Sequence, residues 1–158
     1  MLYDNAQLVS FYSLAYQRTK NPLYKHIVYQ TIDWLEREMV ANDGGFMSAL
    51  DAESEGEEGK FYTWTKTELK SILNEADFEL VKDYYNLNQN GAWEGKYILL
   101  RELKDSNAVK KFGLSKDELT QKMDAINAQL LAARSKRIRP GIDDKILTSW
   151  NGMMIAGL

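Results

Sequence analysis

The sequence of 158 residues contains no cysteine. This absence excludes a disulfide framework, a thiolate nucleophile, a thiolate zinc site and CxxC redox chemistry among these residues. It also removes the usual sequence clue to the redox compartment, which therefore stays open.

Long apolar runs and an excess of positive charge are absent as well. No apolar stretch approaches the roughly 20 residues that a membrane-spanning helix needs. The first four residues also lack the basic and then apolar pattern of a signal peptide. Twenty basic against 23 acidic residues give a net charge of -3, which argues against a nucleic-acid-binding face. We expect a cytoplasmic protein that binds neither membranes nor nucleic acids.

Common catalytic templates are missing too. The chain has no GxSxG, GxxxxGK[ST], GxGxxG or HExxH motif, and its single histidine, His26, cannot supply a two-histidine acid/base pair. Helical spacing places His26 opposite the apolar stripe of its segment, so we expect it at the surface. We predict no cofactor and no metal.

What the sequence does contain is the composition of a globular protein, with 44% hydrophobic and 27% charged residues. Helical periodicity predicts a mainly α fold, and the first helix is expected to turn Leu8, Phe11, Tyr12 and Ala15 inward. Asn21 and Pro22 suit the start of a second helix, which makes an antiparallel hairpin with the first. The expected helices cover about residues 4–20, 22–40, 66–73, 75–85, 105–112, 116–134 and 148–158.

Two short alternating segments, 46–50 and 61–65, flank a strongly acidic stretch. We expect them to pair as a β-hairpin whose long loop is Asp51–Lys60. Part of this loop resembles the first half of an EF-hand, but Tyr62 stands where a bidentate glutamate is required. A looser cation site in these acids is left open beside a solvated acidic loop.

The densest group of chemically active side chains lies in residues 139–152. Carboxylates, an indole face and an amide are suited to binding a polyol. They offer hydrogen-bond acceptors, a flat apolar surface, and a group that both donates and accepts hydrogen bonds. If Thr148 or Ser149 caps the final helix, Asp143 and Asp144 lie near its positive end. In the structural alternative, one of the two aspartates Asp143 and Asp144 caps this helix, and the other pairs with Lys145 or Arg139. The tryptophans could line a sugar cleft or pack in the core: Trp34, Trp64, Trp93 and Trp150.

Several ordered motifs resemble one protein family over essentially the whole chain. They are residues 1–8 (MLYDNAQL), residues 44–64 (GGFMSALDAESEGEEGKFYTW), residues 93–96 (WEGK) and residues 143–152 (DDKILTSWNG). The chain thereby resembles the YyaL-type family, also called spermatogenesis-associated thioredoxin-like proteins. It departs from the family pattern at Gly141, where a histidine often follows the proline, and at Glu53, where an aspartate is common.

The resemblance implies a fragment of an (α/α)6 toroid, built of antiparallel helical hairpins with a small β-hairpin insertion and similar to N-acylglucosamine 2-epimerases and six-hairpin glycosidases. Residues 1–158 would belong to this single domain, without the family's N-terminal thioredoxin-like domain. An incomplete ring leaves apolar helix faces exposed, so we expect self-association.

The function expected from the resemblance is carbohydrate-related, with an epimerase-like or glycosidase-like cavity that takes a sugar or sugar-like molecule. The alternative is a non-catalytic protein-interaction module that accompanies a thioredoxin-like domain. The candidate catalytic residues are Asp143 and Asp144. The candidate substrate-binding residues are Asp4, Asp51, Glu53, Trp64, Arg139, Lys145, Trp150 and Asn151.

Overall fold

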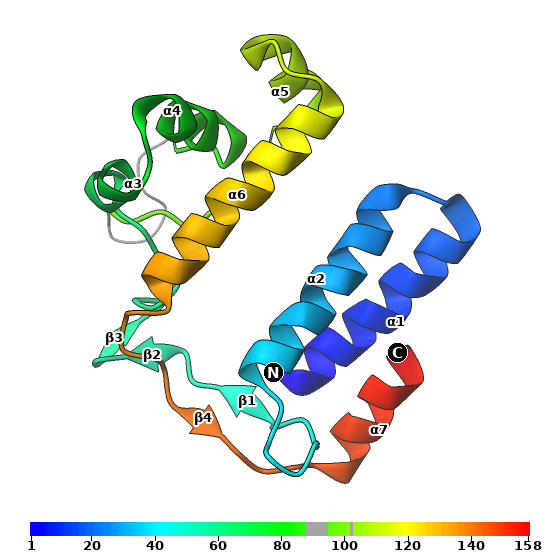
Figure 1. The fold of residues 1–158 in the computed structure, drawn as a ribbon. Coiled ribbons are helices and arrows are strands. Elements are labelled where there is room, and N and C mark those ends of the chain that lie inside the picture. Colours follow the sequence, from blue (N-terminus) through cyan, green and yellow to red (C-terminus); the bar gives the residue numbers. More distant parts are fainter. Residues whose placement is uncertain (88–94, 102) are drawn as a thin grey trace. The chain divides into compact units, whose positions relative to one another are not determined.

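The computed structural model describes residues 1–87, 95–101 and 103–158, and it confirms a mainly α-helical fold with small antiparallel strand pairs (Figure 1). The helices in the described residues are α1 Leu2–Thr19, α2 Pro22–Glu38, α3 Lys66–Ile72, α4 Glu75–Tyr84, α5 Asp105–Phe112, α6 Lys116–Arg134 and α7 Thr148–Gly157. The strands are β1 Ala49–Leu50, β2 Glu53–Ser54, β3 Glu57–Glu58 and β4 Ile142–Asp143. The chain divides into two compact units. The first comprises residues 1–52 and 140–158, and the second comprises residues 53–139.

The first unit contains the expected helical hairpin of α1 and α2 (Figure 1). Asn21 caps α2 by accepting a hydrogen bond from the Leu23 backbone N–H at 3.0 Å, and Pro22 occupies the first helical position. Both features were predicted, because an asparagine satisfies an otherwise unpaired N–H and proline has none to satisfy. His26 is exposed on α2, as expected.

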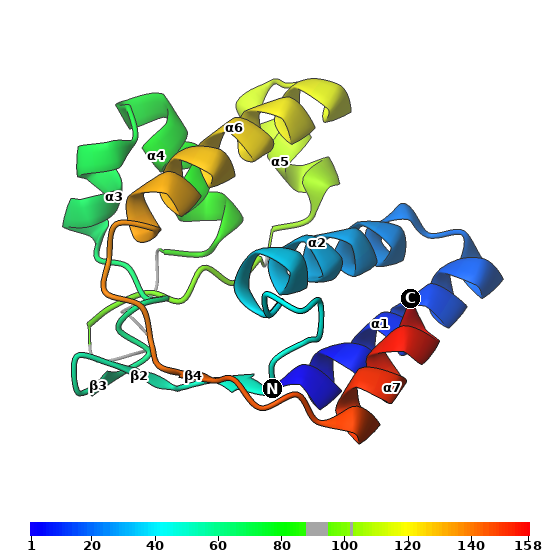
Figure 2. The ribbon, with the colours of Figure 1, turned by 60° about the horizontal axis from the view of Figure 1, so that its bottom comes forward.

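Helix α7 packs along α1 in the same direction (Figure 2). The Tyr3 and Trp150 rings meet edge-to-face at 4.9 Å near the start of both helices. Toward their ends the backbones approach closely, since a Cβ on Gly157 would lie 2.8 Å from the Ser10 Oγ. Packing against both α2 and α7 gives α1 a different inward face from the expected one. Its buried residues are Leu2, Ala6 and Val9.

The expected inward stripe of α1 is therefore wrong in part. Leu8 is 47% exposed and Phe11 is 64% exposed, whereas Tyr12 and Ala15 are half-buried. Because α1 carries apolar residues around most of its circumference, periodicity alone did not distinguish the face that packs from the face that does not.

The β pairing also differs from the prediction. Strand β1 pairs with β4, with Ala49 opposite Asp143 and Leu50 opposite Ile142. The acidic stretch itself forms the small hairpin, in which β2 pairs with β3. Its turn is Glu55–Gly56, where both residues have positive φ. Segments 46–50 and 61–65 therefore do not pair with each other in the described structure, since the first finds its partner about ninety residues further along the chain.

The second unit is built on α6, which packs against α3 and α5. The expected inward residues of α6 are buried or half-buried: Leu119, Met123, Ile126, Leu130 and Ala133. Two predicted capping boxes are present, Thr65 with Glu68 at α3 and Ser115 with Glu118 at α6. Both capping boxes could be predicted from the sequence, because each box satisfies two backbone N–H groups within four residues.

Arg137, just after α6, holds the second unit together. Its guanidinium donates to the backbone carbonyls of Phe61 at 2.9 Å and Thr63 at 2.8 Å, and more distantly to Glu68 at 3.3 Å. The same group lies 4.0 Å from the centroid of the buried Trp64 ring. A guanidinium can serve all of these partners at once because its donors form a planar fork.

Candidate functional site

The ribbon of β1 and β4 brings two predicted site residues to one face. The Asp51 backbone N–H donates to the Gly141 carbonyl at 2.7 Å, so the pairing continues one residue past Leu50. Side chains alternate across a strand, which puts Asp51 on the same face as Asp143. Diagonal neighbours on such a ribbon lie about 7–8 Å apart. Gly141, opposite Asp51, adds no side chain between them.

Asp143 is an exposed, ion-paired carboxylate. The Lys145 ammonium lies 3.0 Å from its Oδ1, and this interaction lowers the pKa of Asp143, with the Ser48 hydroxyl adding to the effect. The Asp143 side chain therefore stays deprotonated over the physiological range. It suits accepting hydrogen bonds from hydroxyl groups better than donating a proton, because a general acid needs a raised pKa.

Asp144 follows Asp143 in the extended chain and is also exposed. Side chains of adjacent residues project in different directions, which argues against a facing pair of catalytic carboxylates. Asp143 pairs with Lys145, which is one half of the structural alternative, whereas the other half is wrong because neither aspartate caps α7.

The predicted site residues of α7 and α1 differ in their contacts and exposure. Asn151 is engaged by the chain itself: its Oδ1 accepts from the Phe46 N–H and its Nδ2 donates to the Phe46 carbonyl, both at 2.9 Å. Trp150 is half-buried against Tyr3, and Asp4 is exposed on α1. Neither Thr148 nor Ser149 caps α7, because Leu147 is the residue that precedes the helix, and it makes no side-chain cap hydrogen bond.

Three predicted binding residues belong to the second unit. Trp64 is only 4% exposed, and the Arg137 guanidinium covers its ring. Most of the Trp64 side chain is therefore buried in the core of the second unit. Glu53 is exposed on β2, and Arg139 lies 5.9 Å from the Phe61 ring centroid. Trp93, considered as part of a sugar cleft, lies outside the described residues.

The acidic hairpin pairs its carboxylates with lysines. Glu55 contacts Lys60 at 3.0 Å, and Glu57 forms an ion pair with Lys96 that lowers the pKa of Glu57. Over residues 1–87, 95–101 and 103–158, no three acidic or histidine side chains gather as metal ligands would. The arrangement favours the solvated acidic loop over the cation site.

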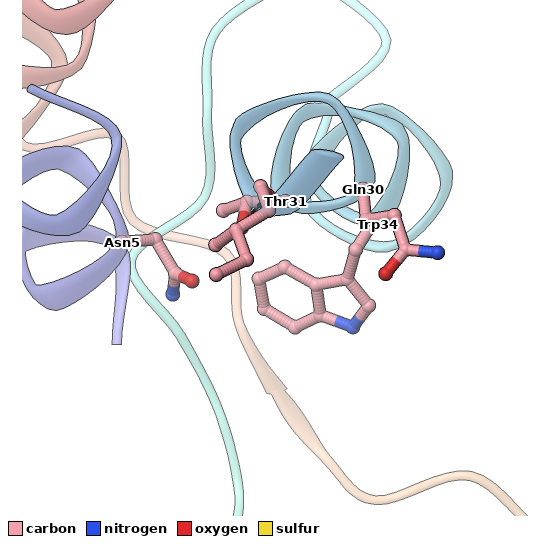
Figure 3. A pocket seen from close by; sticks show the side chains of 5 residues that line it. Asn5, Gln30, Thr31 and Trp34 are labelled. Carbon is pink, nitrogen blue, oxygen red and sulfur yellow. Dashed lines mark hydrogen bonds between the residues drawn. The ribbon is translucent and has the colours of Figure 1, made fainter. Parts of the chain in front are cut away.

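A groove on the first unit lies between α1 and α2 and has a volume of about 340 Å³ (Figure 3). Its lining residues are Asn5 from α1 and Ile27, Gln30, Thr31 and Trp34 from α2. The α2 residues recur at spacings of three and four, which places them along one side of the helix. The half-buried indole and the Ile27 side chain form its apolar part, and the amides and the hydroxyl form its polar part.

The hydrogen-bonding capacity of this groove is partly unused. The Asn5 amide donates to the Met1 carbonyl at 2.9 Å, and the Thr31 hydroxyl donates to the Ile27 carbonyl at 2.8 Å. Both side chains keep oxygen lone pairs that can accept. Among the residues that the structure describes, the Gln30 amide and the Trp34 indole N–H make no hydrogen bond. An indole plate with free amides nearby is chemically suited to a polyol ring.

Sequence reasoning found only one member of this groove, Trp34. Asn5 lies in one of the motifs that carry the family resemblance, and Gln30 is an ordinary exposed glutamine in a helix. Their relation to Trp34 depends on how α1 and α2 pack, so no local sequence signal could have identified the set.

The fold and these side chains define a mainly α-helical protein, and no helix of the described residues is both long and apolar enough to cross a membrane. No family model matches the sequence. Among curated proteins, spermatogenesis-associated protein 20 from Homo sapiens is 29% identical over 182 aligned positions, covering 99% of this chain and 23% of the human protein. An uncharacterised Caenorhabditis elegans protein is 30% identical, covering 100% of this chain and 25% of its own length.

Mus musculus spermatogenesis-associated protein 20 is 28% identical over 99% of this chain. The chain spans about a quarter of the length of these relatives. It is thus a homologue of proteins named spermatogenesis-associated protein 20, and these matches support the family resemblance drawn from its motifs.

Proposed function

We propose that this chain is part of an (α/α) toroid that binds a sugar or a sugar-like molecule. The single observation that carries the proposal is the groove of Trp34, Gln30, Asn5, Thr31 and Ile27. It combines an apolar plate for the CH face of a ring with groups that donate to and accept from hydroxyls. The cytoplasmic location stays a prediction.

The toroid part of the proposal is supported by the direction of α7. In a ring of antiparallel hairpins, the first helix of one hairpin runs parallel to the first helix of the next. Helices α1 and α7 have this relation, with Tyr3 beside Trp150 and Ser10 beside Gly157. The likeness to epimerases and six-hairpin glycosidases, and the accompanying thioredoxin-like domain, belong to the same proposal.

The proposal is one of binding rather than of catalysis by this part of the chain. Asp143 is held deprotonated by Lys145, and Asp51 and Asp143 are both exposed. A glycosidase needs one carboxylic acid with a raised pKa beside a second carboxylate. The ribbon instead offers acceptors for hydroxyl groups. The catalytic roles of Asp143 and Asp144 stay predictions.

The experiment is a nuclear magnetic resonance titration of the 158-residue chain with a panel of mono- and disaccharides at millimolar concentration. We expect the Trp34 indole N–H resonance to shift in a saturable way, because this donor makes no hydrogen bond in the groove. Gln30→Leu should weaken the binding at least threefold, and Tyr29→Leu on the neighbouring exposed position should not. A panel in which no sugar moves the Trp34 resonance would refute the proposal.

A second function, that of a protein-interaction module, is favoured by exposed apolar side chains on α1 and α7. Phe11 is 64% exposed, Leu14 65% and Ile155 70%. Apolar surface of this kind promotes association. We expect light scattering to detect self-association of the chain, which a Phe11→Glu, Leu14→Glu double variant would abolish and the surface variant Gln17→Glu would not. A monodisperse monomer of the unmodified chain would contradict the expected self-association.

A further inference from the structure

We infer that the groove between α1 and α2 selects an uncharged sugar ring over phosphorylated or acidic sugars. The inference rests on the proposed sugar-binding function and adds the class of ligand. Its basis is that all the residues lining the groove are uncharged: Asn5, Ile27, Gln30, Thr31 and Trp34.

The polar groups of the groove match hydroxyls better than anions. The free indole N–H of Trp34 and the free amide of Gln30 can donate, while the oxygens of Asn5 and Thr31 can accept. A hydroxyl both donates and accepts, so it can use either kind of group. A phosphate or carboxylate oxygen only accepts, so it can use the donors of Trp34 and Gln30 but not the lone pairs of Asn5 and Thr31.

The charged groups along the border do not compensate for this. On α2, His26 and Asp33 lie one turn from Gln30 on either side, and Arg37 lies two turns beyond it. The Arg37 guanidinium is engaged by the buried Glu38 carboxylate at 2.9 Å. The Asp33 carboxylate is exposed and repels an anion. An anionic ligand would thus gain no strong charge partner from these α2 side chains.

The size of the groove limits the size of the ligand. Its volume of about 340 Å³ lies at the lower end of the range found for small-molecule sites, which suits a monosaccharide or a disaccharide.

The test compares glucose, galactose and mannose with glucose 6-phosphate and glucuronic acid at pH 7.5, using the Trp34 indole resonance of the full 158-residue chain. We expect at least tenfold weaker binding of the two anionic sugars. Gln30→Lys places a cation in the groove and should raise the affinity for glucose 6-phosphate relative to glucose at least fivefold. Tyr29→Lys adds the same charge at the adjacent position, which is 58% exposed and outside the groove, and should change the ratio less than twofold.

The outcomes separate the two proposals. Equal or tighter binding of the anionic sugars to the unmodified chain would overturn the inference and leave sugar binding standing. Equal responses of the Gln30→Lys and Tyr29→Lys variants would also overturn it, because the selectivity would then not arise in the groove. No response to any sugar would remove the proposed function, and the inference with it.

Discussion

Replacing Arg137 with methionine removes the hydrogen-bonding fork at the centre of the second unit. Methionine keeps much of the apolar stem but cannot donate to the carbonyls of Phe61 and Thr63. Both acceptor residues are buried, with exposed fractions of 3% and 4%, so water does not readily replace the lost donor. The cost of the substitution should therefore include the desolvation of these carbonyls.

The magnitude follows from these contacts. Hydrogen bonds from a charged donor contribute about 1.5–3 kcal/mol each, and two short ones are lost. The cation–π contact with Trp64 adds about 0.5–1 kcal/mol. The pair with Glu68 adds little, since that carboxylate is 48% exposed. Because the Arg137 side chain is itself 20% exposed, we use the lower end of each range and expect a loss of about 3.5 kcal/mol.

The assay is equilibrium urea unfolding followed by far-ultraviolet circular dichroism and tryptophan fluorescence, fitted with two transitions if the units unfold separately. Arg137→Lys should lose about half as much, because an ammonium keeps the charge but cannot reproduce the planar fork. Lys136→Met, at the adjacent exposed position, should change stability by less than about 0.5 kcal/mol. A loss below about 1 kcal/mol for Arg137→Met, or full stability of Arg137→Lys, would refute the reasoning.

Three further predictions concern local features. Gly157→Ala should destabilise the first unit by about 1–3 kcal/mol in thermal melts, because its Cβ would lie 2.8 Å from the Ser10 Oγ. Gly152→Ala has open space around it and should stabilise α7 by up to about 1 kcal/mol in the same assay. Ser115→Ala should cost about 1 kcal/mol in urea unfolding at pH 7, because the Glu118 backbone N–H loses its side-chain acceptor. Burial raises the Tyr84 pKa to about 12. The free energy of unfolding should therefore fall between pH 10 and pH 12, where only the unfolded state loses this proton. The Tyr84 titration is the difference in absorbance at 295 nm between the unmodified chain and Tyr84→Phe, and a midpoint near pH 10 would contradict the prediction.

The helices and their starts could be predicted because their signals are local. Ser115 with Glu118 and Asn21 with Pro22 each act within four residues, so the sequence determines them before any tertiary contact forms. Pairings between distant segments could not be predicted in this way. The partner of β1 is β4, and no turn connects them.

In the candidate site, too, local sequence signals could be recognised and contacts between distant segments could not. The polar stretch around Asp143 was noticed because its residues are adjacent in sequence, yet Asn151 binds the backbone of Phe46 and Asp143 pairs with Lys145. The groove residues Asn5 and Gln30 lie on different helices and carry no shared motif. Only the packing of α1 on α2 brings them to the same groove as Trp34.

The second unit is a continuous stretch of chain, residues 53–139, that interrupts the first unit. During synthesis on a ribosome, this stretch emerges completely before α7 does, and it carries all the residues of its own core. The α1–α2 hairpin must wait for that whole interval before α7 can cover Ala6 and Val9. Since local contacts form faster than distant ones, we expect the inserted unit to fold first and the interrupted unit to remain exposed to chaperones until its last helix arrives.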